Sequence, residues 1–370
     1  MRYTRMPIEI ESPEEKGYST IQYNLAESSV RDITLDSLNV DLSGILLFYG
    51  EHKGMYKLRQ AIIEDSKVLS PEDVIVTAGA AMALFITSTT LLSPKDHLVV
   101  IRPNYGTNIE TPRAIECTIS IVDLSFENNY EIDVAAVAAA IQPNTRLISI
   151  TNPHNPTGRV YSDEILRALI ALAEQHGCHL LVDETYRDLN FQTVLKPYAA
   201  ELSDKVISVS SVSKSYGAPG IRTGWVITRD QKLLHDLLAA REQITLCNSV
   251  VDETIALHLL THKEKLVSAH HEHIRKNFAY LKEWMASQPY LEWVEPQAGV
   301  VCFPRLKAAY KVDVEVLYDK LYNEYGTVVG PGHWFEQERT YMRIGYGYPH
   351  HEELKTGLHN LEKCIKATLL

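Results

Sequence analysis

Lys214 is the first residue in this sequence whose surroundings could support covalent chemistry. It lies in the run 210–217, Ser-Ser-Val-Ser-Lys-Ser-Tyr-Gly, directly after the apolar stretch 206–209. Arg222 follows between two glycines, which let the backbone turn tightly and approach a bound anion. A lysine amine can form an imine with an aldehyde, and hydroxyl groups with an arginine can bind a phosphate. Surface lysines after a strand show the same short pattern, so the assignment depends on the rest of the chain.

Two further segments suit a flat, phosphorylated ligand. Gly79 and Ala80 join an apolar, strand-like run at 74–77 to an alanine-rich helical run. Free amides at the start of a helix bind anions, although close packing of a helix on a sheet explains the small residues equally well. Tyr105 follows the strand-like run 97–101 and could stack on a planar ring.

Other polar residues lie at defined points of the backbone. Asn155 belongs to the segment 151–158, in which two Asn-Pro steps force an extended, turn-making backbone. Asp183 ends another apolar run, shortly before Tyr186, where it either serves a ligand or caps a helix. Arg343 lies inside a strand-like run, an unusual position for a cation without a partner. The imine-forming lysine, with hydroxyl groups and Arg222 nearby for a phosphate, is what the chemistry of pyridoxal phosphate (PLP) requires.

Strand-like and helical runs alternate along most of the chain. The apolar runs expected as strands are 74–77, 97–101, 118–122, 146–150, 179–182 and 206–209, with helices between them such as 134–141 and 162–175. This alternation predicts a parallel α/β sheet, whose ligand sites gather at the carboxyl ends of the strands. Beyond a long amphipathic helix at 263–285, the sequence predicts a small α+β domain with strands near 292–294, 300–303 and 341–345 and helices at 313–325 and 352–366.

The polar beginning of the chain is expected to be extended up to residue 29, followed by a short helix within 31–39. We therefore expect three parts. They are an N-terminal arm at 1–45 that joins the small domain, a large ligand-binding domain at 46–270 and a small C-terminal domain at 271–370.

Composition narrows the possible partners. The 370 residues carry a net charge of −11, which argues against nucleic acid as the main partner. The five cysteines are far apart and lack the spacing of a zinc site, so we expect buried free thiols and no metal. No run of about 18 apolar residues occurs, and the N-terminus lacks the apolar segment of a signal peptide. These features predict a cytoplasmic protein with no membrane contact.

Taken in order, Asn155-Pro156-Thr157-Gly158, Asp183-Glu184-Thr185-Tyr186, Ser211-Val212-Ser213-Lys214 and Arg222 form a set that resembles the class I/II aminotransferases. These are PLP-dependent enzymes of fold type I, such as aspartate aminotransferase. The resemblance extends from about Asn24 to the C-terminus. It implies a large PLP-binding domain with a mostly parallel, seven-stranded-type sheet in an α/β sandwich, and a smaller α+β domain formed by the N-terminal arm and the C-terminus.

The resemblance also implies roles at the cofactor ring. Lys214 would hold PLP as an internal aldimine and, once released, would move a proton at the substrate Cα. Asp183 would pair with the pyridinium nitrogen. Tyr186 and Asn155 would donate to the phenolate oxygen, and Tyr105 would stack on the ring.

Further roles concern the phosphate and the substrate. The residues implied for the phosphate are Gly79, Ala80, Ser211, Arg222 and, reaching across from a second subunit of a homodimer, Tyr49. Arg343 would bind the substrate α-carboxylate, with help from Asn155. Glu27 would lie where the arm covers the substrate, and an acid there favours a basic or polar substrate.

Three functions follow from this resemblance. The first is transfer of an amino group between an L-amino acid and a 2-oxo acid. The second keeps the cofactor and changes the outcome to β- or γ-elimination, or to oxidation or cyclisation of a basic amino acid such as arginine. The third is a non-catalytic PLP-binding regulator, which the negative charge disfavours. The segments 297–300 and 331–335 depart from the common family pattern, so side-chain specificity does not transfer from a well-known member.

Overall fold

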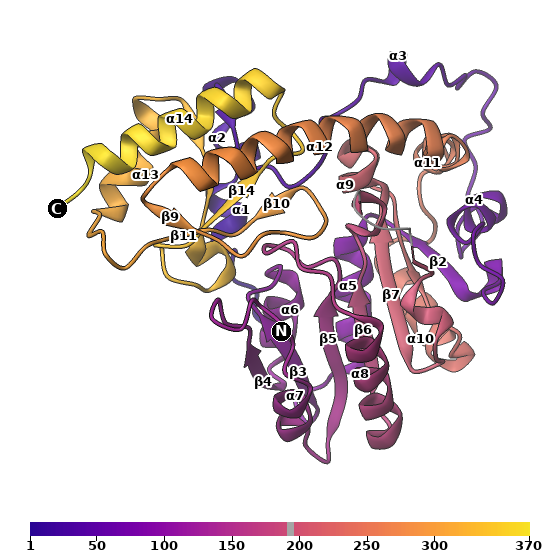
Figure 1. Cartoon of the computed structure of the whole chain (residues 1–370). Helices are drawn as coiled ribbons and strands as arrows, with labels where there is room; N and C mark the ends of the chain where they lie inside the picture. The colour runs from indigo at the N-terminus through magenta and orange to yellow at the C-terminus, as the bar shows by residue number, and fades with distance from the viewer. Residues whose placement is uncertain (191–195) are drawn as a thin grey trace.

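A seven-stranded sheet forms the centre of the large part of the molecule in the computed structural model, which describes residues 1–190 and 196–370 (Figure 1). Its strands are β2 (Val74–Thr77), β3 (His97–Arg102), β4 (Thr118–Asp123), β5 (Thr145–Thr151), β6 (His179–Asp183), β7 (Val206–Ser211) and β8 (Gly224–Ile227). They lie in the order β2-β8-β7-β6-β5-β3-β4. All neighbouring pairs are parallel except those that β8 forms with β2 and β7. The mostly parallel α/β sheet expected from the sequence is confirmed.

Helices cover both faces of this sheet. On one face lie α5 (Ala80–Leu91), α6 (Thr107–Ile115) and α10 (Gln231–Glu242), and on the other lie α7 (Val134–Ala140) and α8 (Asp163–His176). Successive strand residues point to opposite faces, so Leu98 and Val100 pack with α5 whereas Val99 packs with α8. Inner strands such as β6 and β7 are buried on both faces, so their sequences are mostly apolar, whereas the edge strand β4 is partly exposed.

The strand β8 was not expected. The glycines around Arg222 indicate a turn, and that turn is followed directly by an antiparallel strand of four residues. Gly224, the first residue of β8, lies opposite Thr77 of β2 and Ser211 of β7. The antiparallel direction of β8 thus brings its beginning to the edge of the sheet at which the parallel strands end.

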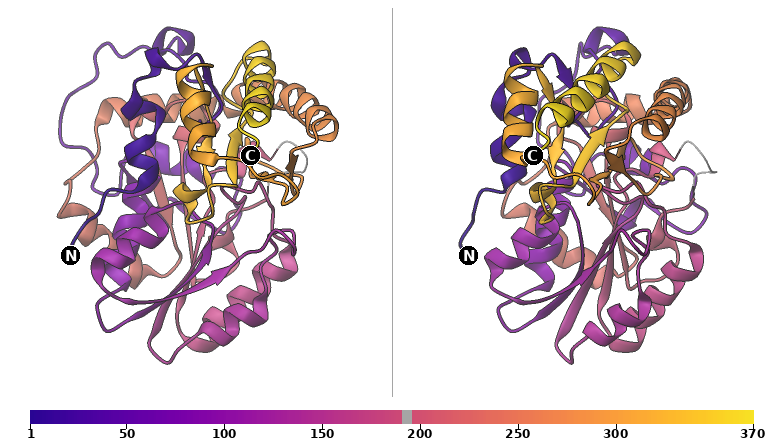
Figure 2. Two further views of the ribbon diagram at one scale, coloured as in Figure 1. Left: turned by 90° about the vertical axis from the view of Figure 1, so that its left-hand side faces the viewer. Right: turned by 60° about the vertical axis from the view of Figure 1, so that its left-hand side comes forward.

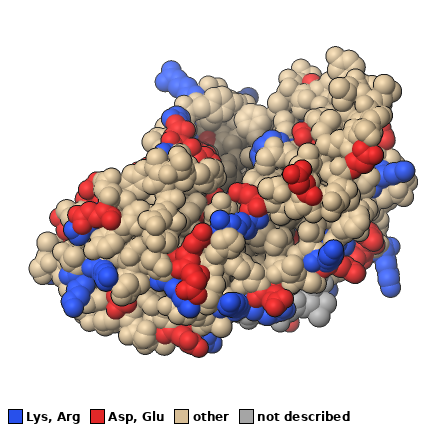
Figure 3. Space-filling view, turned by 90° about the horizontal axis from the view of Figure 1, so that it is seen from above, with Lys and Arg blue, Asp and Glu red and all other residues tan. Residues whose placement is uncertain are grey.

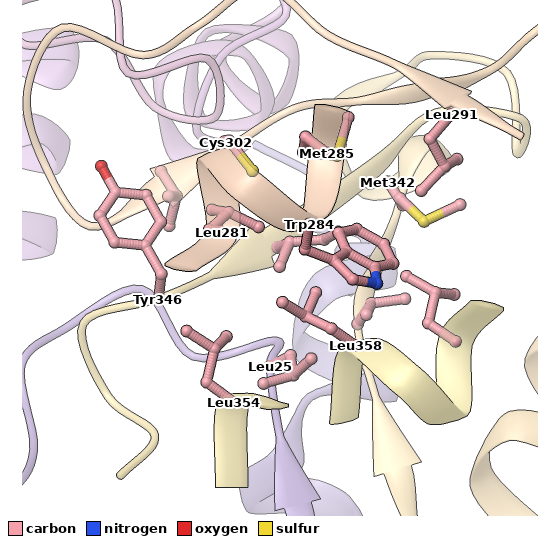
Figure 4. Packing of buried hydrophobic residues seen from close by; sticks show 14 of the residues in the cluster. Leu25, Leu281, Trp284, Met285, Leu291, Cys302, Met342, Tyr346, Leu354 and Leu358 are labelled. Atoms are coloured by element: carbon pink, nitrogen blue, oxygen red, sulfur yellow. The ribbon is translucent and has the colours of Figure 1, made fainter. Parts of the chain in front are cut away.

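The C-terminal part packs on that edge. The long helix α12 (Lys263–Ser287) leads into it, and α13 (Val314–Asn323) and α14 (His351–Ala367) pack around small sheets. These sheets contain β9 (Leu291–Glu292), β10 (Val301–Cys302), β11 (Arg305–Leu306), β12 (Thr327–Val328), β13 (Gly330–Pro331) and β14 (Met342–Gly345). Their core includes Trp284, Met342 and Leu358, with Leu25 of the N-terminal arm packed among them (Figure 4). The predicted α+β character is confirmed.

The N-terminal arm differs from the expected extended segment. It contains α1 (Pro7–Glu11) and α2 (Pro13–Lys16), and its strand β1 (Tyr23–Asn24) pairs with β12. Proline in the first turn suits both helices, and the Ser12 hydroxyl caps α2 by accepting from the Glu15 amide. The helix expected within 31–39 is limited to α3 (Leu35–Leu38). Figure 2 shows the arm beside the C-terminal part, where the Lys16 ammonium lies over the ring of Tyr322 in α13.

The arm joins the C-terminal part through β1, in agreement with the expected architecture. The domain boundaries at residues 45 and 270 stay a prediction. Residue 270 lies inside α12. The remaining helices of the large part are α4 (Tyr56–Ile62), α9 (Val212–Ser215) and α11 (Val250–Thr261).

Three smaller expectations can be compared with the structure. Among the described residues, no helix is both long and apolar enough to span a membrane. All five cysteines are free, and four are buried, but Cys247 is half-buried, so the expectation of buried thiols is wrong for that residue. On the face shown in Figure 3, Lys and Arg are interspersed with Asp and Glu, and the surface is hollowed near its centre.

Candidate active site

A cavity of about 310 Å³ lies where the carboxyl ends of the parallel strands meet the N-terminal arm and the C-terminal part. The predicted site residues that line it are Glu27, Ala80, Tyr105, Asn155, Asp183, Tyr186, Ser211, Lys214, Arg222 and Arg343. Gly79 adjoins it through contact with Arg222. Tyr49 lies on the surface, with 79% of its area exposed. Only Tyr49 is therefore separate from the other predicted residues.

The strand order explains this convergence. Gly79, Tyr105 and Asn155 lie in the loops that follow β2, β3 and β5, while Asp183 is the last residue of β6. Parallel strands end at one edge, so these loops meet there. Arg222 reaches the same edge because it precedes the antiparallel strand β8.

Lys214 lies in α9, a single helical turn that follows β7. Its Nζ atom is 3.4 Å from Oε1 of Glu27, which comes from the N-terminal arm. Burial is the largest single influence and lowers the pKa of the Lys214 ammonium, but the Glu27 carboxylate together with Tyr186 and Tyr105 raises that pKa above its usual value. The lysine is therefore a protonated ammonium at neutral pH and must lose a proton before it can act as a nucleophile.

Asp183 is a buried carboxylate, and its hydrogen bonds come from neutral donors. The Thr185 hydroxyl donates to it at 2.6 Å and the Thr185 amide at 3.1 Å. Burial raises the pKa of Asp183, although the donors from Thr185 and Asn108 oppose this rise. A buried carboxylate in this state is stabilised by a cationic hydrogen-bond donor, and a protonated ring nitrogen is such a donor.

Tyr186 presents a second unmet requirement. Its hydroxyl is buried and has no hydrogen-bond partner, although buried polar groups are normally paired. Tyr105, across the cavity, keeps a partner, because its hydroxyl lies 3.5 Å from Oε1 of Glu9. The unpaired hydroxyl of Tyr186 fits a ligand oxygen such as the phenolate of PLP.

The anion-binding end is formed by the start of α5 and by Arg222. Gly79 has a φ of +83°, which favours glycine, and a Cβ atom there would lie only 2.5 Å from Nη2 of Arg222, so a larger residue would displace the guanidinium. The Gly79 amide already donates to the Thr77 carbonyl. Ala80 follows as the first helical residue, where an α-helix leaves its amides free. These amides, together with Arg222 and Ser211, fit a phosphate.

At the other end, Arg343 projects from β14 and is 4% exposed. Its Nη1 donates to Oδ1 of Asn155 at 3.2 Å, and its Nη2 donates to the Ala26 carbonyl at 2.7 Å. The Nε atom is buried without a partner, and burial lowers the pKa of the guanidinium. A buried guanidinium bound only to neutral groups can accept a carboxylate from a ligand.

The sequence analysis missed the part of the cavity wall that α1 and α2 of the arm provide. Ile8, Glu9, Ser12, Pro13 and Glu14 line the cavity. The sequence Ser12-Pro13-Glu14-Glu15 carries a helix-start signal, with serine at the N-cap, proline at the first position and glutamate at the third. That signal would have located α2, although not the cavity that it covers.

Comparison with known proteins agrees with this geometry. Residues 22–361 match the family described as aminotransferase class I and II. The chain is 29% identical to capreomycidine synthase from Streptomyces vinaceus, over 92% of this chain and 89% of that protein. It is 27% identical to the arginine–pyruvate transaminase of Pseudomonas aeruginosa, over 80% of this chain and 77% of that protein.

Among solved structures, the PLP-dependent aminotransferase from Streptococcus suis superposes with a TM-score of 0.91 at 27% identity, covering 100% of this chain and 99% of that one. The family match covers most of the chain, and the same chain brings a lysine, a buried aspartate and a potential phosphate site into one cavity. Together these findings establish membership of the family. The chain belongs to the class I and II aminotransferase family and is a PLP-dependent enzyme of that family.

Proposed function

We propose that this enzyme moves an amino group between an L-amino acid and a 2-oxo acid, with Lys214 as the residue that binds the cofactor. One observation carries the proposal. Among the described residues, Asp183 has no cationic partner, the Tyr186 hydroxyl has no acceptor and Arg343 has no ion pair, and all three line one cavity with Lys214. A protonated ring nitrogen, a phenolate and a substrate carboxylate would meet these three requirements together.

PLP, when bound, supplies an aldehyde for the substrate amine and a ring that accepts electrons from the substrate Cα. Lys214 would hold the cofactor through its Nζ atom and, once released, would take the proton from the substrate Cα and deliver it to the cofactor carbon that receives the amino group. Asp183 keeps the ring nitrogen protonated. Tyr186 donates its hydroxyl hydrogen to the phenolate oxygen. Asn155 accepts from Arg343 through its oxygen, which leaves its amide NH₂ free to donate to the same phenolate.

Arg343 orients the substrate. Its guanidinium can hold both oxygens of the α-carboxylate, which positions the Cα–H bond next to Lys214. Tyr105 would stack on the ring, and the amides at the start of α5, the Ser211 hydroxyl and Arg222 would hold the phosphate. Gly79 contributes by leaving room for Arg222 at this position.

A homodimer belongs to this proposal, with the partner's Tyr49 completing the phosphate site. The segment 46–49 supports it, because Leu46, Leu47, Phe48 and Tyr49 are 71%, 78%, 59% and 79% exposed. Consecutive exposed apolar residues are uncommon on a monomer surface and mark an interaction site. Leu47→Glu should shift the molar mass from dimer to monomer in light scattering. Val68→Glu, a substitution at another half-exposed apolar residue, is the control. A dimer that persists in Leu47→Glu would contradict this arrangement.

A cytoplasmic location is proposed on the basis of the free cysteines of the described residues, because thiols persist in reducing compartments. Cell fractionation of the native host tests it.

The visible spectrum of the enzyme with PLP tests the reaction. Addition of a suitable L-amino acid should replace the cofactor band by a pyridoxamine-like band, and a 2-oxo acid should reverse the change. Lys214→Ala should lose turnover, whereas Lys232→Ala, at an exposed lysine of α10, should not. Ordinary turnover by Lys214→Ala would refute the assignment.

Cyclisation or oxidation of a basic amino acid such as arginine is the second candidate. The likeness to capreomycidine synthase over 92% of this chain favours it, as does the acidic Glu27 beside Lys214. Both reactions begin with removal of the proton from Cα, so the same residues serve them. Product analysis by mass spectrometry distinguishes them, because a 2-oxo acid indicates transamination and a cyclic amino acid indicates cyclisation.

A further inference from the structure

The charged residues of the active-site cavity do not balance once the proposed roles are assigned. The cations in its wall are Lys214, Arg222 and Arg343, and the acids are Glu9, Glu14, Glu27 and Asp183. The cofactor uses Lys214, Arg222 and Asp183, and the substrate carboxylate uses Arg343. Three carboxylates are left, and no lysine or arginine in this described wall is left to oppose them.

Glu27 is the most constrained of the three. Its side chain is 11% exposed, and its Oε1 accepts from the Ser28 amide at 2.9 Å. Burial favours the neutral acid, but the Lys214 ammonium and the Ser28 amide together hold the pKa of Glu27 below its usual value. Glu27 is therefore a carboxylate at neutral pH.

The attachment of Lys214 to the cofactor changes the environment of Glu27. The lysine nitrogen then belongs to the cofactor linkage and no longer provides a free ammonium beside the carboxylate. A nearly buried carboxylate that loses its cation is destabilised unless another cation replaces it. A cationic group on the substrate can replace it.

Glu9 and Glu14 extend the negative wall toward the mouth of the cavity. They belong to α1 and α2, and the intervening Glu11 fixes these helices to the C-terminal part. The Glu11 carboxylate accepts from the Trp334 indole at 2.8 Å and lies 3.0 Å from Nε2 of His333. Glu9 and Glu14 are therefore held at the cavity by a defined contact.

The cavity also carries ligand-directed groups that are independent of these acids. The Tyr186 hydroxyl and Nε of Arg343 are buried without partners, and both residues line the same wall. Arg343 fixes the α-carboxylate end of a substrate, so the side chain must extend into the remaining space. Arg343 donates to the carbonyl of Ala26, which directly precedes Glu27, so this acid lies near the bound amino acid.

We propose that the substrate is an amino acid with a cationic side chain, a guanidinium or an ammonium, and that Glu27 with Glu9 and Glu14 of the arm selects it. This inference rests on the proposed role of Arg343 at the substrate carboxylate. A substrate with an anionic side chain meets three carboxylates, and an aliphatic side chain leaves Glu27 without a cation. The arm is thus the specificity element of the enzyme.

Binding of unreactive ligands to the PLP-loaded enzyme tests this selection without turnover. The probes are 5-guanidinopentanoate, hexanoate and adipate, which share one carboxylate and lack the α-amine. Calorimetry should show the guanidino compound binding at least tenfold more tightly than hexanoate, with adipate weakest. Tighter binding of adipate, or equal binding of all three, would overturn the inference.

Variants locate the selection. Glu27→Gln should reduce the ratio of guanidinopentanoate to hexanoate affinity by about tenfold, since loss of one charge-assisted contact has this magnitude. Glu9→Gln and Glu14→Gln should reduce it severalfold. Glu15→Gln, which alters an exposed acid of α2 outside the cavity wall, should leave the ratio unchanged. The use of a ratio cancels any general effect of Glu27→Gln on Lys214. An unchanged ratio in all three cavity variants would refute the role of these acids.

A reaction panel separates this inference from the proposed function. L-arginine, L-norleucine and L-glutamate are each mixed with the PLP-loaded enzyme, and the change in the cofactor band is recorded. Faster conversion with L-arginine supports both statements. Conversion that is equally fast with L-norleucine overturns the cationic preference alone. Failure of all three to change the band, together with preserved selective binding of guanidinopentanoate, overturns the proposed reaction alone.

Discussion

Replacement of Arg343 separates the contribution of this residue to substrate binding from its contribution to stability. Its guanidinium is 4% exposed and donates to Asn155 and to the Ala26 carbonyl, with Nε unpaired. The best variant is Arg343→Met, which removes the charge and keeps most of the volume. Arg343→Lys keeps the charge but loses the fork that matches a carboxylate.

The expected magnitude follows from the contacts. A substrate carboxylate held by two charge-assisted hydrogen bonds gains about 1.5–3 kcal/mol from each, or roughly 3–6 kcal/mol in total. Because about 1.4 kcal/mol corresponds to a factor of ten, Arg343→Met should weaken substrate binding by about two to four orders of magnitude. Arg343→Lys, which retains one such contact, should weaken binding by about tenfold to a hundredfold on the same scale.

Stability should change much less. The substitution removes two hydrogen bonds, worth about 1 kcal/mol each, but it also removes a buried charge that has no ion pair. These effects oppose one another, so the free energy of unfolding should change by less than about 2 kcal/mol. The melting temperature of the PLP-loaded variant measures this change.

The assay for binding is the substrate dependence of the single-turnover change in the cofactor band, recorded by stopped flow. Arg146→Met, at an exposed arginine near the start of β5, is the control and should behave as the unmodified enzyme. If Arg343→Met kept its apparent substrate affinity within about threefold, the carboxylate would be bound elsewhere, and the assignment of the cavity ends would be wrong.

Three further substitutions test other parts of the site. Gly79→Ala should weaken PLP binding, measured by titration, and should lower the melting temperature more than the control Gly177→Ala. Both glycines have a positive φ, but of the two only Gly79 has Arg222 close to the added Cβ atom. Equal effects of the two substitutions would show that this crowding is unimportant. Tyr186→Phe should leave the melting temperature of the cofactor-free protein unchanged or slightly higher, because the Tyr186 hydroxyl is unpaired among the described residues. The same substitution should shift the absorption band of bound PLP. An unshifted band would place this hydroxyl away from the cofactor. Burial raises the pKa of Glu11, but its hydrogen bonds with Trp334 and His333 lower this pKa by more, so the pKa lies below its usual value. The ionised carboxylate therefore stabilises the fold, and Glu11→Gln should lower the melting temperature at pH 7. That difference should vanish as the pH falls below the usual carboxyl value of 4.5, because the ionised acid stabilises the fold only above it. A pH-independent difference would contradict the ion-based contact.

The fold was predictable because its signals are local. Runs such as 97–101 and 206–209 are mostly apolar, as is typical of strands buried on both faces, and the structure places β3 and β7 there. The small β8 was missed because the glycines that allow the Arg222 turn hide a strand of four residues. The short helices of the arm were missed because helices of five and four residues have no apolar period to detect.

The sequence by itself determined the kind of chemistry. A lysine after a strand, an aspartate at a strand end and an arginine between glycines are each tied to backbone signals a few residues away, and their order identifies the family. The roles of the site residues and the domain boundaries stay predictions. The role of Tyr49 also requires a second subunit, and the boundaries require a measurement of independent folding.

Only the tertiary structure decided which groups meet across the cavity. Arg343 bonds to Asn155, 188 residues away in the chain, and Glu27 lies beside Lys214 at a separation of 187 residues. No local pattern encodes such contacts, because they depend on how the arm and the C-terminal part pack against the edge of the sheet. The same packing brings Glu9 and Glu14 to the wall of the site, and the proposed preference for a cationic substrate rests on this arrangement.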